Sequence, residues 1–123
     1  MHRSRLGCLV IDCPAEDVVD AAAFWGATLG GVVEVDEDGS YAQIHDQGEL
    51  KVLVQAVDHA ARVHIDIEAD DKDAEVARLE ALGATVVTRV KRWIVMEAPT
   101  GHRFCVVNPQ SDVFEHRAKS WDD

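Results

Sequence analysis

One order of structural elements occurs twice along the chain, and this repeat constrains the fold more than any other feature. Residues 63–68 alternate apolar and polar side chains as a strand does, and a helical stretch at 70–82 follows them. Three β-rich runs come after that helix, at 84–88, 93–96 and 103–107. The second half of the chain therefore predicts the order βαβββ.

The first half predicts the same order. An apolar run at 6–12 precedes a helix, for which Pro14 and the acids after it suit the first turn and Gly30 marks the end. Asp70 is the expected cap of the second helix. Two tandem βαβββ units predict an α+β fold in which a curved mixed sheet forms a cup with the helices outside. A ferredoxin-like βαββαβ sandwich with added strands is the alternative.

The chain has 123 residues, enough for one domain with a core of its own. We expect a single domain over 1–123. Its parts are a first unit at 6–57, a second unit at 62–109 and a C-terminal tail at 110–123.

Charge and cysteine content exclude several classes of function. The formal net charge is −11, which disfavours nucleic acid and anionic membranes as partners. No apolar run approaches the roughly 18 residues of a membrane span. The three cysteines show no CxxC spacing and predict no disulfide framework, which suits a cytoplasmic protein.

Four segments of the chain resemble one known family. The segments are FWGATLGG at 24–31, HIDIEADD at 64–71, LEALGA at 79–84 and WIVMEAPTGHRFC at 93–105. In this order and spacing they resemble the glyoxalase-like domain of the vicinal oxygen chelate superfamily, over residues 6–109. That superfamily contains glyoxalase I-like lyases, dioxygenases and metal-free bleomycin resistance proteins, so the resemblance implies a fold and leaves the activity open. It also implies a homodimer.

The resemblance further implies a divalent metal site, which this sequence matches only in part. His64 occupies the position of one family ligand, whereas Cys8 and Cys105 stand where harder ligands are usual. The fourth position falls on Gln55, or on Leu53 if the register differs by two residues. Magnesium, manganese and iron(II) prefer oxygen and nitrogen donors, so we expect an incomplete metal site and no cofactor. Zinc held by Cys8, His64 and Cys105 is the alternative.

Strand alternation predicts which side chains face the cup. If Ile65 and Ile67 face a helix, then His64, Asp66 and Glu68 face the concave side, as do Cys8 and Val10 in the first unit. Tyr41 and Trp93 lie on matching strands of the two units. The predicted ligand-binding residues are Cys8, Val10, Tyr41, Gln55, His64, Asp66, Trp93 and Cys105.

These residues favour a protein that binds a small organic ligand in the cup, with Asp66 and Glu68 as polar contacts. The alternative is a divergent metal-dependent lyase or dioxygenase-type enzyme, or a metal-free one in which His64 acts as acid or base. A dimeric scaffold with a plugged cup is a third hypothesis. The sequence alone assigns no catalytic residue.

Overall fold

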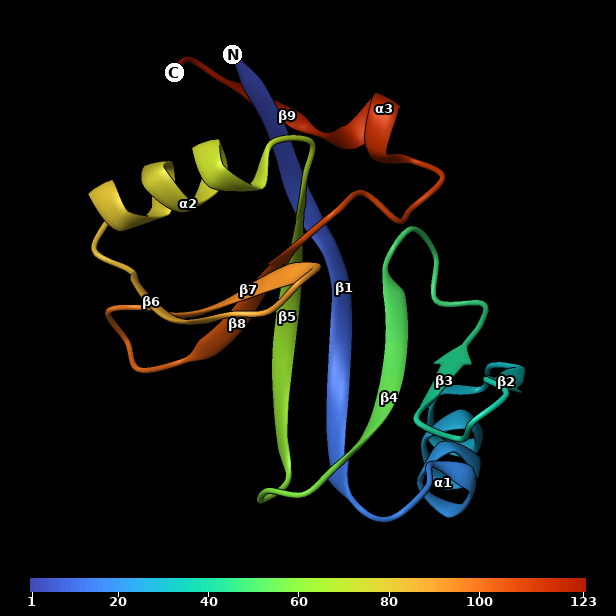
Figure 1. Cartoon of the computed structure of the whole chain (residues 1–123). Helices are drawn as coiled ribbons and strands as arrows, with labels where there is room; N and C mark the ends of the chain where they lie inside the picture. The colour runs from blue at the N-terminus through green and yellow to red at the C-terminus, as the bar shows by residue number, and fades with distance from the viewer. The chain divides into compact units, whose positions relative to one another are not determined.

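The computed structural model describes all residues from 1 to 123 and contains nine strands and three helices (Figure 1). The strands are β1 (His2–Pro14), β2 (Val33–Val35), β3 (Tyr41–Ile44), β4 (Lys51–Val57), β5 (Arg62–Ala69), β6 (Thr85–Arg89), β7 (Trp93–Glu97), β8 (Arg103–Val107) and β9 (Lys119–Trp121). The helices are α1 (Val19–Leu29), α2 (Lys72–Ala81) and α3 (Phe114–Arg117). The predicted α+β class is confirmed.

The chain divides into two compact units, which we describe separately. The N-terminal unit is Cys8–His64. The C-terminal unit combines Met1–Gly7 with Ile65–Asp123. Strands β1 and β5 therefore each contribute residues to both units.

The two units share one strand topology. In the N-terminal unit the strand order is β2-β3-β4-β1, with β1 and β4 parallel and the other pairs antiparallel. In the C-terminal unit the order is β6-β7-β8-β5, with β5 and β8 parallel and the other pairs antiparallel. The same order and the same strand directions confirm the predicted βαβββ repeat and differ from the ferredoxin-like alternative.

Each unit buries one face of its sheet against its own helix. In the N-terminal unit Ala22 of α1 packs with Ile11, Ile44 and Val54. In the C-terminal unit the core contains Val76, Ala84, Ile94, Met96 and Val106. Burial of these aliphatic groups is the main force that holds each helix on its sheet.

The helix boundaries agree with the sequence in one place and differ in two. Gly30 ends α1 with a positive φ of 74°, and its N–H donates to the Gly26 carbonyl at 2.8 Å. Strand β1, however, continues through Pro14, so α1 begins only at Val19. Asp71 rather than Asp70 caps α2, because its side chain accepts from the Ala74 N–H at 3.0 Å. Asp70 instead accepts from the Arg3 N–H at 2.8 Å.

The C-terminal tail has secondary structure that the sequence pattern did not predict. Helix α3 buries Phe114, and β9 pairs antiparallel with the start of β1 (Figure 1). The Trp121 indole N–H donates to the Ser4 hydroxyl at 2.8 Å. The first and last strands of the chain, β1 and β9, therefore pair with each other in the C-terminal unit.

A buried ionic network holds this junction to α2. Glu75 is fully buried and accepts from Arg78 at 2.9 and 2.8 Å and from His2 at 2.7 Å. Burial by itself disfavours the charged carboxylate, but the hydrogen bonds from Arg78 and His2 lower the pKa of Glu75 overall. Burial also opposes the charge of His2, yet its hydrogen bonds to Glu75 and Asp123 raise its pKa.

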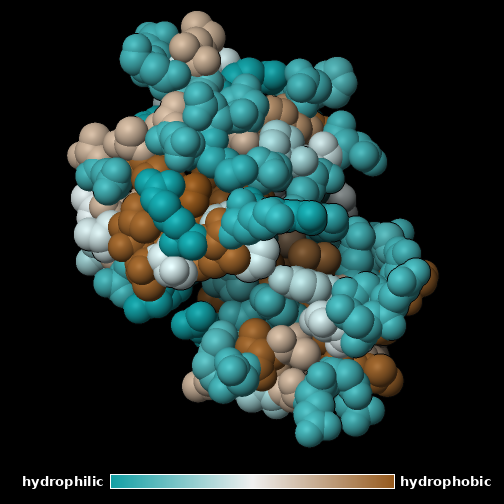
Figure 2. All heavy atoms as spheres, in the orientation of Figure 1, coloured by the Kyte–Doolittle hydropathy of each residue, from teal (hydrophilic) through white to brown (hydrophobic).

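The visible surface is mostly hydrophilic and is interrupted by hydrophobic patches (Figure 2). Large apolar side chains that remain exposed include Leu6, Phe24, Val32, Val63 and Ile65. None of the helices has the length and apolar character that crossing a membrane requires.

Candidate functional site

The face of the N-terminal sheet that lies opposite α1 carries four of the predicted site residues. Leu9 and Ile11 pack with the helix core, so strand alternation puts Cys8 and Val10 on the other face, as predicted. Tyr41 and Gln55 share that face, because Gln55 is in register with both Asp12 of β1 and Tyr41 of β3. The Gln55 amide donates to the Tyr41 hydroxyl at 2.9 Å.

Asp12 is a buried acid on the same face. Its side chain is 1% exposed, and its Oδ2 atom lies 2.9 Å from Nδ1 of His64. Arg62 Nε lies 3.4 Å from the same oxygen, and His59 Nε2 lies 3.9 Å from it. The second oxygen, Oδ1, is buried and has no hydrogen-bond partner. One oxygen of this carboxylate is thus shared by three basic side chains, while the other is unsatisfied.

The pairing with Asp12 sets the orientation of the His64 ring. An ionised carboxylate only accepts hydrogen bonds, so Nδ1 is the ring atom that donates to Asp12. His64 is largely buried, with 12% of its side chain exposed. A carboxylate bonded to one ring nitrogen is the arrangement that orients histidine ligands in metal sites.

The C-terminal sheet carries three further predicted residues on one face. Asp66 is in register with Cys105, and Trp93 with Val107. Phe104 and Val106 pack in the core against α2, so the alternate residues Asp66, Trp93 and Cys105 lie on the opposite face. Trp93 is 38% exposed.

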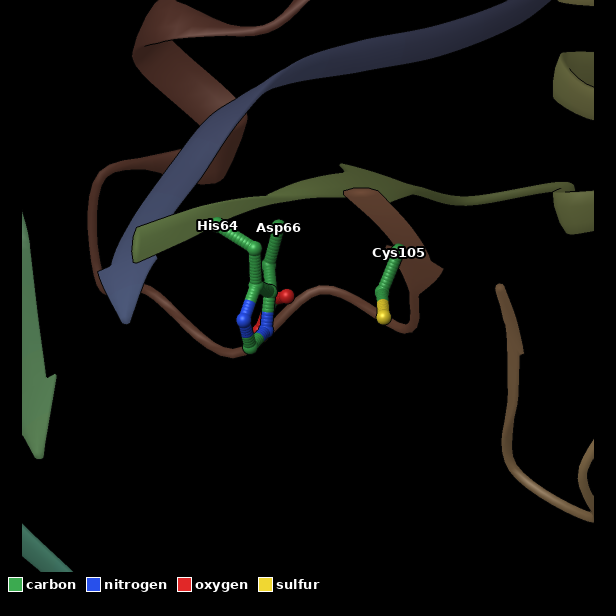
Figure 3. Close-up of side chains that lie close together, drawn as sticks. All are labelled: His64, Asp66 and Cys105. Carbon is green, nitrogen blue, oxygen red and sulfur yellow. The ribbon is translucent and has the colours of Figure 1, made fainter. Parts of the chain in front are cut away.

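Three potential metal ligands lie close together along β5 and β8. His64 and Asp66 are two residues apart on β5 and project from the same face, and Cys105 projects from β8 beside them (Figure 3). One ligand atom from each lies within 4.8 Å of the others. The structure thus brings Asp66 to His64 and Cys105, where the sequence suggested Cys8. The Cys8 thiol is buried and contacts the Leu9 carbonyl at 3.7 Å.

This donor set fits zinc better than the harder metals. Zinc accepts histidine nitrogen, carboxylate oxygen and thiolate sulfur, and three protein ligands leave one position open for a substrate or water. Magnesium and manganese prefer all-oxygen surroundings, which a thiol does not provide. In this group of three residues, the carboxylate comes from Asp66 on β5 and the thiol comes from Cys105 on β8.

Glu68 serves the fold, although strand alternation suggested a ligand contact. Its Oε2 accepts from the N–H groups of Gln110 and Ser111 at 2.6 and 2.9 Å. Its Oε1 accepts from the Ser111 hydroxyl at 2.5 Å and from Arg5 at 3.2 Å. Gly7 leaves room for it, because a Cβ there would meet the Glu68 Cγ at 2.1 Å. Both oxygens are engaged, so Glu68 holds the loop that follows β8.

Sequence reasoning missed Asp12, Arg62 and His59 as site residues. Alternation along β1 signals Asp12, since it lies two residues beyond Val10 on the same face. Nothing local signals His59, which precedes β5, or Arg62, which begins it. The neighbouring Cys13 is a poor nucleophile, because burial raises the pKa of its thiol and the Asp12 carboxylate raises it further.

Comparison with known proteins identifies the family. Two solved structures share the fold. One is a hypothetical protein from Bacillus halodurans C-125, which is 11% identical with a TM-score of 0.62 over 98% of this chain and 99% of that chain. The other is the NAD-dependent benzaldehyde dehydrogenase from Legionella pneumophila, which is 10% identical with a TM-score of 0.59 over 83% of this chain and 99% of that chain. A comparison with curated proteins finds no match. The sequence profile described as Glyoxalase-like domain matches residues 8–107. The chain therefore belongs to the glyoxalase-like domain family.

Proposed function

We propose that the protein binds a small organic ligand on the face of the N-terminal sheet opposite α1. The observation that carries this proposal is the buried Asp12 carboxylate, whose Oδ1 atom has no hydrogen-bond partner. A buried polar atom without a partner costs about 1–3 kcal/mol, so folded proteins rarely keep one without a use. A ligand that donates a hydrogen bond to Asp12 would supply the missing partner.

The neighbours of Asp12 suit such a ligand. Leu53 is half-buried and provides apolar surface on the same face, and Gln55 and Tyr41 continue it with polar groups. Tyr41 is 37% exposed, so its ring is accessible for stacking. A mostly apolar surface with a few fixed polar groups is typical of small-molecule sites.

A titration monitored by NMR tests this proposal. We expect phenol and benzamide, two neutral aromatic donors, to shift the backbone amides of β1, β3 and β4 and to reach saturation. The double variant Tyr41→Phe, Gln55→Leu should bind at least about tenfold more weakly, because two polar contacts of about 1 kcal/mol each are lost.

The matched control is Gln47→Ala, which removes an amide held by the Leu29 and His45 carbonyls instead. Binding by this variant should equal that of the wild type. Shifts that never saturate, or that are the same in the double variant, would refute a ligand site on this face.

A second candidate function is a metal-dependent enzyme of the lyase or dioxygenase type. It is supported by the close approach of His64, Asp66 and Cys105. Asp12 would hold His64 in the tautomer that presents Nε2, and Asp66 and Cys105 would complete the ligand set. Zinc bound there would polarise a carbonyl group or lower the pKa of a bound water. Without metal, the Asp12–His64 pair could still move a proton at Nε2.

Elemental analysis of the purified protein separates the two candidates. The enzyme candidate requires one zinc ion per chain, lost in His64→Ala and in Cys105→Ser. Cys13→Ser is the matched control, because this thiol bonds to the Ile11 carbonyl on the helix side of β1 and should not affect zinc content. Protein that takes up no stoichiometric zinc would leave only the binding function or the metal-free proton transfer.

We also propose that the protein is a cytoplasmic homodimer. Exposed apolar side chains on the strands, such as Leu6 and Ile65, support self-association, and three free cysteines suit a reducing compartment. A monomeric mass by light scattering at micromolar concentration would contradict the dimer.

A further inference from the structure

Arg62 is a basic side chain that the site holds in place without using up its hydrogen-bonding capacity. It begins β5, and its side chain is 46% exposed. Only its Nε atom has a hydrogen-bond partner, Asp12 Oδ2 at 3.4 Å. The guanidinium has five N–H donors in a rigid plane, so its two terminal amino groups remain available.

The anchor of Arg62 is a buried carboxylate. Asp12 is buried on the sheet face opposite α1, in register with Gln55 on the neighbouring strand. A carboxylate that holds an arginine by Nε fixes the plane of the guanidinium and leaves a fork of two parallel N–H groups. That fork matches the two oxygen atoms of a carboxylate or phosphate group.

Charge around Asp12 also favours an anion. Arg62 balances the carboxylate, and His59 and His64 both approach the same oxygen. On a chain with a net charge of −11, an anionic ligand meets less repulsion beside these basic side chains than over the acidic surface.

We infer that Arg62, held by Asp12, binds an oxyanion group of the ligand, either a carboxylate or a phosphate monoester. This inference rests on the proposed function, since it names the charged group of the molecule bound on the same face. The oxyanion lies against the exposed Arg62 fork, and the rest of the ligand extends over Leu53 and Tyr41.

The test compares charged and neutral probes on the intact protein. The labelled wild type is titrated at constant ionic strength with acetate, methyl phosphate and acetamide, the last being a neutral analogue of acetate. At least one anion should shift the amides of residues 12 and 59–62 to saturation, with acetamide at least about tenfold weaker, because charge-assisted hydrogen bonds are roughly twice as strong as neutral ones. Saturation by acetate or by methyl phosphate identifies which group the site accepts.

Variants then assign the effect to Arg62. Arg62→Gln should weaken anion binding at least about tenfold, and Arg62→Lys should retain part of it, since lysine keeps the charge and loses the fork. Arg89→Gln is the matched control, because Arg89 is an exposed arginine paired with Asp73 and should not alter binding. Amide dispersion in the same spectra shows whether each variant folds.

Two outcomes overturn the inference. One is the absence of saturation with either anion, and the other is equal affinity in the wild type and Arg62→Gln. If phenol and benzamide still bind in either case, the proposed ligand site stands and only the anion specificity is wrong.

Discussion

Asp12 and Glu68 are buried acids at the ends of equivalent strands, and the two units use them differently. In the C-terminal unit both oxygens of Glu68 accept hydrogen bonds from the loop after β8 and from Arg5. In the N-terminal unit Asp12 shares one oxygen among basic side chains, and its Oδ1 has no partner. The comparison teaches that a duplicated fold can satisfy an acid fully at a position in one copy and leave an oxygen of the equivalent acid unsatisfied in the other.

The largest loss of stability should follow removal of the Glu68 carboxylate, whose two oxygens both accept hydrogen bonds. Glu68→Ala leaves two backbone N–H groups and the Arg5 guanidinium without their partner, so we expect a loss of about 3–5 kcal/mol in the free energy of unfolding. Urea denaturation measures it. Glu68→Gln is the control, because it keeps one acceptor and should lose less. A change below about 1 kcal/mol would contradict the structural role of Glu68.

Gly7→Ala should lower stability by displacing the Glu68 side chain. The added Cβ would lie 2.1 Å from the Glu68 Cγ, so the carboxylate must leave the loop, with an expected cost of about 1–3 kcal/mol. In a Glu68→Ala background the cost should largely disappear, because the obstructing side chain is gone. A double-mutant cycle measured by urea denaturation tests this coupling. Additive costs would mean that Gly7 matters for another reason.

Asp12→Asn should affect stability much less than ligand binding. The amide keeps an acceptor for His64, and Oδ1 has no hydrogen bond to lose, so we expect a change of no more than about 1 kcal/mol in unfolding free energy. Anion binding should fall about tenfold, because Arg62 loses its charged anchor. Denaturation and NMR titration of one sample give both numbers. A loss as large as that of Glu68→Ala would remove the contrast between the units.

The smallest expected effect is the change of stability with pH. It tests whether Glu75, a third buried acid, contributes to stability as Glu68 does. The raised pKa of His2 contributes stability that is present below its ordinary value of 6.5 and is lost as pH rises through the folded-state pKa. The lowered pKa of Glu75 contributes stability that is present above its ordinary value of 4.5 and is lost as pH falls through the folded-state pKa. This network should therefore stabilise most between those two values.

His2→Gln should remove the decline on the alkaline side of that interval. Melting temperatures between pH 5 and pH 8, a range that begins near the lower of the two ordinary values, give the measurement. His45→Gln is the control, since His45 pairs with Glu34 at the surface. An unchanged profile in His2→Gln would show that His2 does not titrate with folding.

Much of the architecture was readable because it depends on local patterns. Period-two alternation identified the strands and put Cys8 and Val10 on the face opposite α1. The repeated order of elements predicted the shared topology, and four short segments indicated the glyoxalase-like family. The start of α1 and the elements of the tail were not readable, because β1 continues through Pro14 and β9 forms only by pairing with a strand more than a hundred residues away.

The sequence by itself therefore determined the fold class, the repeat, the family and the faces of the strands. Only the tertiary structure decided that Asp12 meets His64 and Arg62, that Glu68 is engaged by the loop at Gln110 and Ser111, and that Asp66 joins His64 and Cys105. The physical reason is one of range. The face on which a strand side chain lies follows from the pattern of its neighbours in sequence. The partner of a buried charge is set instead by which distant segments of the chain pack beside it in the folded structure.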